Sequence, residues 1–173
     1  MAKRVHHSAA ARTKSNSDVN KIMHNKQYQQ VCIFLVEDDD VDAESIQRAF
    51  KKLRIANPVY RAKDGLEAIN KLKSNEVPEP RIILLDLNLP KKTGLEVLEV
   101  LRNDERLRSS IVFVLTTSKS DEDICAAYEK NVAGYIVKDE MADSFEQVLK
   151  MLSTYWRIIE VPTTPESNKS MLR

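Results

Sequence analysis

The chain has 173 residues, of which 31% are charged, and a formal net charge of +1. That length suits one domain with tails and is sufficient to bury a hydrophobic core. No apolar run approaches the roughly 20 residues that cross a bilayer, and residues 1–30 lack the apolar centre of a secretory signal. Membrane-spanning and secreted classes are therefore excluded, and we expect a cytoplasmic protein. Cys32 and Cys125 have neither a zinc nor a redox spacing, which predicts two buried free thiols.

Basic charge is concentrated at the start of the chain. Residues 1–30 carry Lys3, Arg4, Arg12, Lys14, Lys21 and Lys26 against Asp18 alone. This composition predicts a basic, disordered N-terminal tail, and contact with nucleic acid or anionic lipid is the alternative. Residues 162–173 are polar, contain Pro162 and Pro165, and are predicted to form a flexible C-terminal tail. The folded domain is therefore expected at residues 31–161.

From residue 31 onwards, short apolar runs alternate with segments of helical periodicity. The runs at 31–36, 82–85, 111–115 and 132–137 predict four strands, and the short segment 59–62 after Asn57-Pro58 predicts another, which makes five. Helical spacing predicts five buried stripes: Ile46, Ala49, Phe50 and Leu53; Leu66, Ile69 and Leu72; Leu95, Leu98 and Leu101; Ile124, Ala127 and Tyr128; and, in a helix at 143–156, Phe145, Val148, Leu149, Leu152 and Trp156. Two helices begin with a capping-box spacing, Asp64 with Glu67 and Thr93 with Glu96. This alternation predicts an α/β fold, a doubly wound five-stranded parallel sheet with five helices.

Polar residues follow the last apolar residue of four of these strands. Glu37 and Asp38 follow the first strand, Asp86 the third, Thr116 the fourth and Lys138 the fifth. Because parallel strands end at one edge of the sheet, we expect these side chains to converge. Three carboxylates in one cleft repel one another unless a cation compensates, and Mg²⁺, which prefers carboxylate, water and phosphate oxygens, suits that task.

A lysine and a hydroxyl facing this cleft would bind the oxygens of a phosphoryl group transferred onto a carboxylate nucleophile. The further acids Asp39, Asp40 and Asp42 are interpreted differently, as residues at a helix start that suit the macrodipole.

Four sequence features together resemble the receiver domain of two-component response regulators. They are the acidic pair after the first strand and the motifs L-L-D-L-N-L-P, V-L-T-T-S and G-Y-I-V-K, and the resemblance covers about residues 31–157. It implies a flavodoxin-like sheet of order 2-1-3-4-5, and Asp86 as the phosphoacceptor that takes phosphate from a sensor histidine kinase. It also implies that Thr116 and Lys138 contact the phosphoryl group.

The same resemblance implies roles for neighbouring residues. Mg²⁺ would be bound by Glu37, Asp38, Asp86 and the backbone carbonyl of Asn88. Tyr135 stands at the position of an aromatic switch residue that responds to Thr116, and a half-buried strand tyrosine is the alternative reading. Three residues would tune the lifetime of the phosphoryl group, namely Asn88, Thr117 and Ser118. Asp139 stands where receivers commonly have a proline that follows a cis peptide bond.

The resemblance also bears on partners. The chain is similar to single-domain receivers of bacterial phytochrome kinases in V-E-D-D, L-T-T-S and the aromatic segment 155–162. It implies a signalling phosphoacceptor rather than an enzyme, with a sensor histidine kinase and a downstream or phosphotransfer protein as partners. The narrower similarity favours a phytochrome-type kinase. A homodimer through the fourth helix, the fifth strand and the fifth helix is expected, without a DNA-binding domain. An interaction module that does not use phosphate is the alternative, and an aspartyl phosphohydrolase is disfavoured because Asn88 replaces its second acid.

Overall fold

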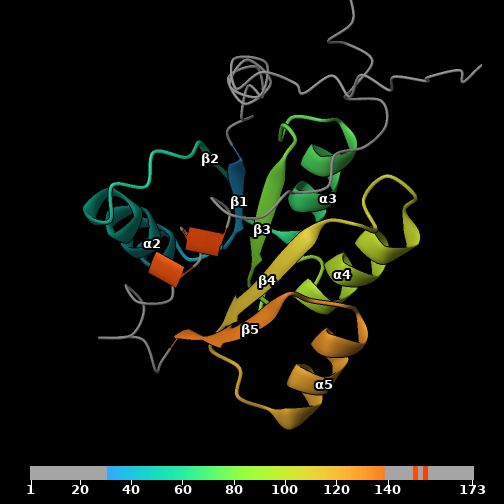
Figure 1. Ribbon diagram of the computed structural model, residues 1–173. Coiled ribbons are helices and arrows are strands. Elements are labelled where there is room, and N and C mark those ends of the chain that lie inside the picture. Colours follow the sequence, from blue (N-terminus) through green and yellow to red (C-terminus); the bar gives the residue numbers. More distant parts are fainter. Residues whose placement is uncertain (1–30, 139–149, 152–153, 156–173) are drawn as a thin grey trace, which may run out of the picture.

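The computed structural model describes residues 31–138, 150–151 and 154–155. The elements in chain order are β1 (Cys32–Val36), α2 (Asp40–Lys52), β2 (Val59–Ala62), α3 (Gly65–Lys73), β3 (Arg81–Leu85), α4 (Gly94–Asn103), β4 (Ile111–Thr116), α5 (Asp121–Glu129) and β5 (Gly134–Val137). The strands form one parallel sheet in the order β2-β1-β3-β4-β5 (Figure 1), which confirms the predicted doubly wound sheet. Both predicted tails and most of the helix expected at 143–156 lie outside the described residues.

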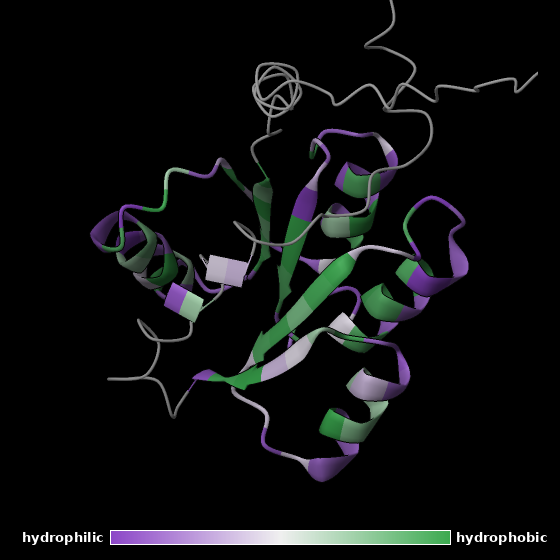
Figure 2. Ribbon diagram, in the orientation of Figure 1, coloured by the Kyte–Doolittle hydropathy of each residue, from purple (hydrophilic) through white to green (hydrophobic). Residues whose placement is uncertain are grey.

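Helices cover the sheet on both faces. Successive strand residues point to opposite faces, so Ile33 packs on the side of α2 with Phe50, whereas Phe34 faces the side of α3, α4 and α5. Tyr155 belongs to the α2 side, where its ring meets that of Phe113 edge-on at 5.7 Å between centroids. Figure 2 shows the apolar strands gathered in the middle of the molecule. With both faces buried, the sheet offers its carboxyl edge for polar chemistry.

Side-chain caps fix where the helices begin. Thr93 and Glu96 form the complete capping box predicted for α4. At α3 the prediction is half right, because Asp64 accepts from the N–H of Glu67 at 2.7 Å, but Glu67 Oε2 accepts from the N–H of Lys63. Each cap satisfies N–H groups that a helix start otherwise leaves without a partner.

Some predicted core positions were wrong. Leu66 is 43% exposed and Tyr128 is 52% exposed, and Cys125 is exposed although Cys32 is buried. Small residues are buried in both helices, namely Ala68 in α3, which the pattern did not include, and Ala127 in α5, which it did. Periodicity gives large side chains too much weight, whereas a helix lying close to a sheet favours small ones. Within the part of the chain that is described, no helix has the length and apolar content needed to cross a membrane.

Candidate functional site

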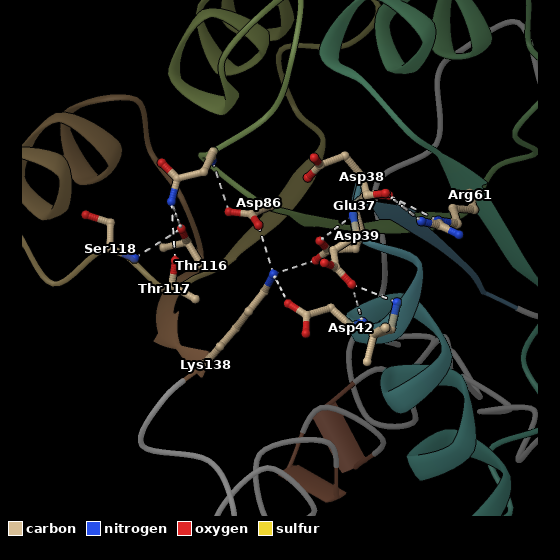
Figure 3. Close-up of polar contacts among 12 residues, drawn as sticks. Glu37, Asp38, Asp39, Asp42, Arg61, Asp86, Thr116, Thr117, Ser118 and Lys138 are labelled. Atoms are coloured by element: carbon tan, nitrogen blue, oxygen red, sulfur yellow. Dashed lines mark hydrogen bonds and ion pairs between the residues drawn. The ribbon is translucent and has the colours of Figure 1, made fainter.

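The carboxyl ends of four strands meet at one place. Glu37 follows β1, Asp86 follows β3, Thr116 ends β4 and Lys138 follows β5. Figure 3 shows their side chains turned toward one another. Lys138 Nζ lies 2.8 Å from Asp86 Oδ2 and 2.6 Å from Glu37 Oε2. The parallel sheet thus brings together residues up to 101 positions apart in sequence.

Asp86 is held by backbone groups around its strand end. Its N–H donates to the carbonyl of Val36 at 3.0 Å, and its Oδ1 accepts from the N–H of Asn88 at 3.0 Å. Gly94 at the start of α4 lies behind it, where a Cβ would come within 2.3 Å of the Asp86 carbonyl oxygen. The side chain is almost completely buried, and Oδ2 is bound to Lys138. Asp86 is therefore a buried carboxylate of fixed orientation.

Three carboxylates form a set of oxygen donors. Glu37, Asp38 and Asp86 each offer one oxygen, and these oxygens all lie within 4.8 Å of one another. Glu37 is buried and Asp38 is exposed. Burial raises the pKa of Glu37, and the hydrogen bond and charge of Lys138 act in the opposite direction. Such a set suits a hard divalent cation, which prefers carboxylate oxygens and water.

Asp39 and Asp40 behave as the helix-start acids that the sequence predicted. Asp39 is the N-cap of α2, and its side chain accepts from two backbone N–H groups of the first turn. Asp40 pairs with Arg61 at 2.6 Å and with Lys63 at 2.8 Å. Hydrogen bonds from Lys63 and then Arg61 lower the pKa of Asp40. Both acids are thus satisfied by partners on the side of α2 and β2.

The prediction for Asp42 was incomplete. Although Asp42 lies in the first turn of α2, its Oδ2 is 2.9 Å from Lys138 Nζ and so belongs to the site. The strand-end rule missed it because it finds only residues that directly follow a strand. Asp42 lies in the first turn of α2, directly after the loop that follows β1, and from there its side chain returns to the same edge of the sheet.

Lys138 is the centre of this charge cluster. Its side chain is 12% exposed and its ammonium group contacts Glu37, Asp42 and Asp86. Burial alone would lower the pKa of Lys138, but the hydrogen bonds to Asp86, Glu37 and Asp42 raise it overall. Lys138 therefore keeps its positive charge. The three carboxylates that contact it and the neighbouring Asp38 carry more negative charge than this one lysine can balance.

Thr116 presents a buried hydroxyl beside Asn88. Thr116 Oγ1 accepts from the N–H of Ser118 at 3.3 Å and from Asn88 Nδ2 at 3.4 Å. Asn88 Nδ2 also donates to Thr117 Oγ1 at 3.4 Å. The three residues predicted to tune the site, Asn88, Thr117 and Ser118, therefore surround Thr116 at the end of β4.

Tyr135 contacts the loop after β4 rather than the hydroxyl of Thr116. It is half-buried, and its OH donates to the carbonyl of Ser118 at 3.1 Å. Burial raises the pKa of its phenol. Ser118 therefore connects the two predicted switch residues, because its N–H donates to Thr116. Asp139, and with it the peptide bond after Lys138, lies outside the described residues.

A doubly wound sheet of this order, with acids, threonine and lysine at the carboxyl ends of its strands, defines a receiver-type signalling domain. Residues 33–150, more than half of the chain, match the response regulator receiver domain. The chain belongs to this family and is the receiver domain of a response regulator, a signalling protein of two-component systems. The predicted family is thereby confirmed.

Curated relatives and solved structures agree with this placement. The chain is 39% identical to a probable methanogenesis regulatory protein, FilR2, of Methanothrix harundinacea over 72% of this chain and 82% of that protein. It is 35% identical to the response regulator Rcp1 of Synechocystis over 77% of this chain and 92% of Rcp1. A structure of the phosphorylated cyanobacterial phytochrome response regulator RcpA superposes with a TM-score of 0.69 at 35% identity, covering 78% of this chain and all of that one. The chain is thus related to phytochrome response regulators.

A structure of the Mn²⁺-bound form of Rcp1 superposes with the same TM-score. It superposes with a TM-score of 0.69 at 33% identity and covers 77% of this chain and 99% of that chain. The resemblance to response regulators of phytochrome kinases, first seen in short motifs, therefore extends over most of the domain.

Proposed function

We propose that this protein is a phosphorylation-operated switch that accepts a phosphoryl group on Asp86 from the phosphohistidine of a sensor kinase. The observation that carries the proposal is the contact of Lys138 Nζ with Asp86 Oδ2 at 2.8 Å in a buried cluster. An ammonium group beside a carboxylate nucleophile can hold the oxygens of an incoming phosphoryl group. Related proteins include one solved in a phosphorylated form.

In the proposed transfer, an oxygen of Asp86 forms a bond to phosphorus while the bond from phosphorus to the imidazole nitrogen of the donor breaks. The imidazole leaves with the electron pair of that bond and takes up a proton as needed from water. The acyl phosphate then carries about two negative charges where the carboxylate of Asp86 carried one, so the transferred group adds negative charge to the site. Lys138 and the hydroxyl of Thr116 bind its oxygens, because both groups donate hydrogen bonds.

The acidic cluster fits a divalent cation, which we propose to be Mg²⁺. Glu37, Asp38 and Asp86 supply hard oxygen donors within 4.8 Å of one another, and the backbone carbonyl of Asn88 is the further ligand. When bound, the cation offsets the negative charge so that an anionic phosphoryl group can approach a carboxylate. The Mn²⁺-bound form of Rcp1 supports a divalent ion in this class of site.

The neighbours of Thr116 are assigned to control of lifetime and signal. Asn88 and Ser118 flank the path of attacking water, and the β-branched Thr117 crowds it. Tyr135 acts with Thr116 as the switch, and Ser118 connects the two residues through its backbone N–H and carbonyl. Phosphorylation adds charge and acceptor oxygens that such a two-state element can sense.

A sensor histidine kinase is the upstream partner, and a phytochrome-type kinase is favoured by the similarity to Rcp1 and RcpA. We place the reaction in the cytoplasm. The downstream partner is an effector protein or a phosphotransfer protein. A homodimer forms through α5, β5 and the segment 143–156. The molar mass of the protein in solution, measured by light scattering with and without a phosphodonor, tests for the homodimer.

The decisive experiment uses a small acyl phosphodonor with Mg²⁺, followed by intact mass spectrometry. The protein is expected to gain the mass of one phosphoryl group, and the matched variant Asp86→Asn, which keeps the size of the side chain, is expected to gain none. Removal of Mg²⁺ with a chelator should abolish the gain. A protein that gains no mass with any donor would instead be an interaction module that does not use phosphate.

A further inference from the structure

Lys138 has no hydrogen-bond donor left for a phosphoryl group in the structure described here. An ammonium group has three N–H donors. Lys138 Nζ contacts three carboxylate oxygens, at 2.6 Å from Glu37, 2.8 Å from Asp86 and 2.9 Å from Asp42. Engagement of a phosphoryl oxygen therefore requires that at least one of these contacts is weakened.

Asp42 is held in place by its helix. It belongs to the first turn of α2, and its N–H donates to the N-cap Asp39 at 3.0 Å. In Figure 3, Asp42 and Glu37 approach the ammonium group of Lys138 from the side of α2, whereas Thr116 lies on the other side of Asp86. The ion pair with Asp42 thus keeps the ammonium group of Lys138 on the α2 side of the site.

Burial decides which contact is released most readily. Glu37 is 1% exposed and Asp86 is 6% exposed, so an unpaired charge at either would be costly. The side chain of Asp42 is 42% exposed, and water can replace the lysine as its partner. The contact with Asp42 is therefore the one that gives way.

We propose that Asp42 is a positioning residue that holds Lys138 in the unphosphorylated site and competes with the phosphoryl group for its ammonium donors. Asp42 thereby weakens the phosphoryl-bound state relative to the resting state. The inference rests on the proposed function of the same site, and it deepens that proposal by naming what opposes the switch. It predicts that removal of the Asp42 charge releases Lys138 for the phosphoryl group.

The chain offers a matched control in the same helical turn. Asp40 pairs with Arg61 and Lys63 rather than with Lys138. Asp42→Asn and Asp40→Asn therefore remove the same charge from the same end of α2 with the same change of side chain. Only Asp42→Asn removes a carboxylate that contacts Lys138.

The first measurement needs no metal and no phosphate. Nitrogen–hydrogen correlation spectra of the side-chain ammonium of Lys138 report how firmly it is held, through the exchange of its protons with water. In metal-free protein we expect exchange to be faster in Asp42→Asn than in the wild type, with Asp40→Asn matching the wild type.

The second measurement is the affinity for fluoroberyllate, a phosphoryl mimic, by calorimetry at Mg²⁺ saturating for each variant. Asp42→Asn is expected to bind it about two- to fivefold more tightly than the wild type, as loss of a partly exposed ion pair implies. Equal affinities and equal exchange in the wild type and Asp42→Asn would overturn the inference and leave the proposed function intact. An equal gain in fluoroberyllate affinity in Asp42→Asn and Asp40→Asn would also overturn the inference, because the loss of one negative charge, and not the loss of the contact with Lys138, would then be the cause. A wild type that neither binds fluoroberyllate nor accepts phosphate would overturn the proposed function and the inference together.

Discussion

Arg61 provides several of the hydrogen bonds that hold the acidic loop after β1. Its Nε and Nη2 donate to the carbonyl of Glu37 at 3.0 and 2.9 Å, and Nη2 also donates to the carbonyl of Asp38 at 3.2 Å. Its Nη1 binds Asp40 at 2.6 Å. These bonds fix the peptide planes from which the carboxylates of Glu37 and Asp38 project. Arg61 is therefore expected to orient a cation site that it does not itself enter.

Replacement of Arg61 by alanine is predicted to weaken Mg²⁺ binding about tenfold, because partners that orient ligands commonly have effects of this size. Arg61→Lys should restore little of the affinity, since one ammonium group cannot reproduce the planar fork. Calorimetric titration with Mg²⁺ measures both. Arg48→Ala is the control, because Arg48 is an exposed arginine of α2 that donates to Ser45. An Arg61→Ala protein that binds Mg²⁺ as tightly as this control would refute the role of Arg61.

The two cysteines are predicted to differ in reactivity. Cys32 is buried in β1, and burial raises its pKa from 9.0 to about 11, whereas Cys125 is exposed. At pH 8 only about one Cys32 in a thousand is a thiolate, the form that reacts. Iodoacetamide should therefore modify one thiol in the native protein and two in the denatured protein, as counted by intact mass. Cys125→Ser should remove the native modification, and rapid native labelling of that variant would contradict the prediction.

The same shift has a consequence for stability. The folded state binds the proton of Cys32 more tightly than the unfolded chain does. This contribution to the free energy of unfolding is therefore complete below pH 9 and is lost as the pH rises toward 11.

At the scale of elements, Arg102 connects α4 to the segments around it. Its guanidinium donates to four backbone carbonyls: Lys130 at 2.7 Å, Asn131 at 2.9 Å, Arg108 at 2.9 Å and Ser110 at 3.1 Å. Two of these carbonyls lie at the end of α5 and two lie in the loop before β4. The side chain thus satisfies carbonyls that the end of a helix and a loop leave without a partner.

Arg102→Ala is predicted to lower the free energy of unfolding by about 2 to 3 kcal/mol, because several carbonyl groups lose a charged donor at once. Urea denaturation followed by circular dichroism measures the change. Arg102→Lys keeps the charge and much of the length but not the fork, and we expect it to recover less than half of the loss. If Arg102→Ala unfolds at the same urea concentration as the wild type, the hydrogen bonds of Arg102 do not contribute to the free energy of unfolding.

Sequence reasoning succeeded for elements that local rules define. The predicted strand ends differ from the observed ones by at most two residues. The central strands β1, β3 and β4 were visible as apolar runs because a strand buried on both faces carries few polar residues. Thr93 and Glu96 marked the start of α4 because a capping box is a local hydrogen-bond pattern. Leu66 and Tyr128 were misplaced because their exposure depends on how closely each helix approaches the sheet, which is a tertiary property.

In the site, too, the residues that a local pattern defines were predicted and those that depend on tertiary packing were missed. Residues that directly follow strands, such as Asp86 and Lys138, are placed by topology alone. Asp42 was missed because it reaches Lys138 through the rise of a helix and the length of two side chains. The link from Tyr135 to Ser118 depends on the path of a loop, which no local pattern specifies. Sequence therefore indicates which strand ends carry chemistry, and packing decides what else joins them.

At the scale of the whole molecule, Ser118 connects the site to α5. Its N–H donates to Thr116, its carbonyl accepts from Tyr135, and its hydroxyl donates to Asp123 in the first turn of α5. A displacement of Thr116 toward a phosphoryl group would therefore act on a residue that also holds the start of this helix. Coupling of this kind requires a contiguous set of contacts with two arrangements.

The coupling can be tested by removing the contact of Asp123 and leaving the phosphate-binding residues unchanged. Binding of fluoroberyllate to the wild type is expected to change the amide hydrogen exchange of residues 120–129. In Asp123→Ala that change should be reduced by at least about half, while the affinity for fluoroberyllate stays within about twofold, because the altered residue lies beyond the phosphate-binding groups. Glu122→Ala is the matched control, since Glu122 is an exposed neighbour in the same helical turn. If Asp123→Ala transmits the full change to α5, the signal leaves the site by another route, and the bond from Ser118 serves only to begin the helix.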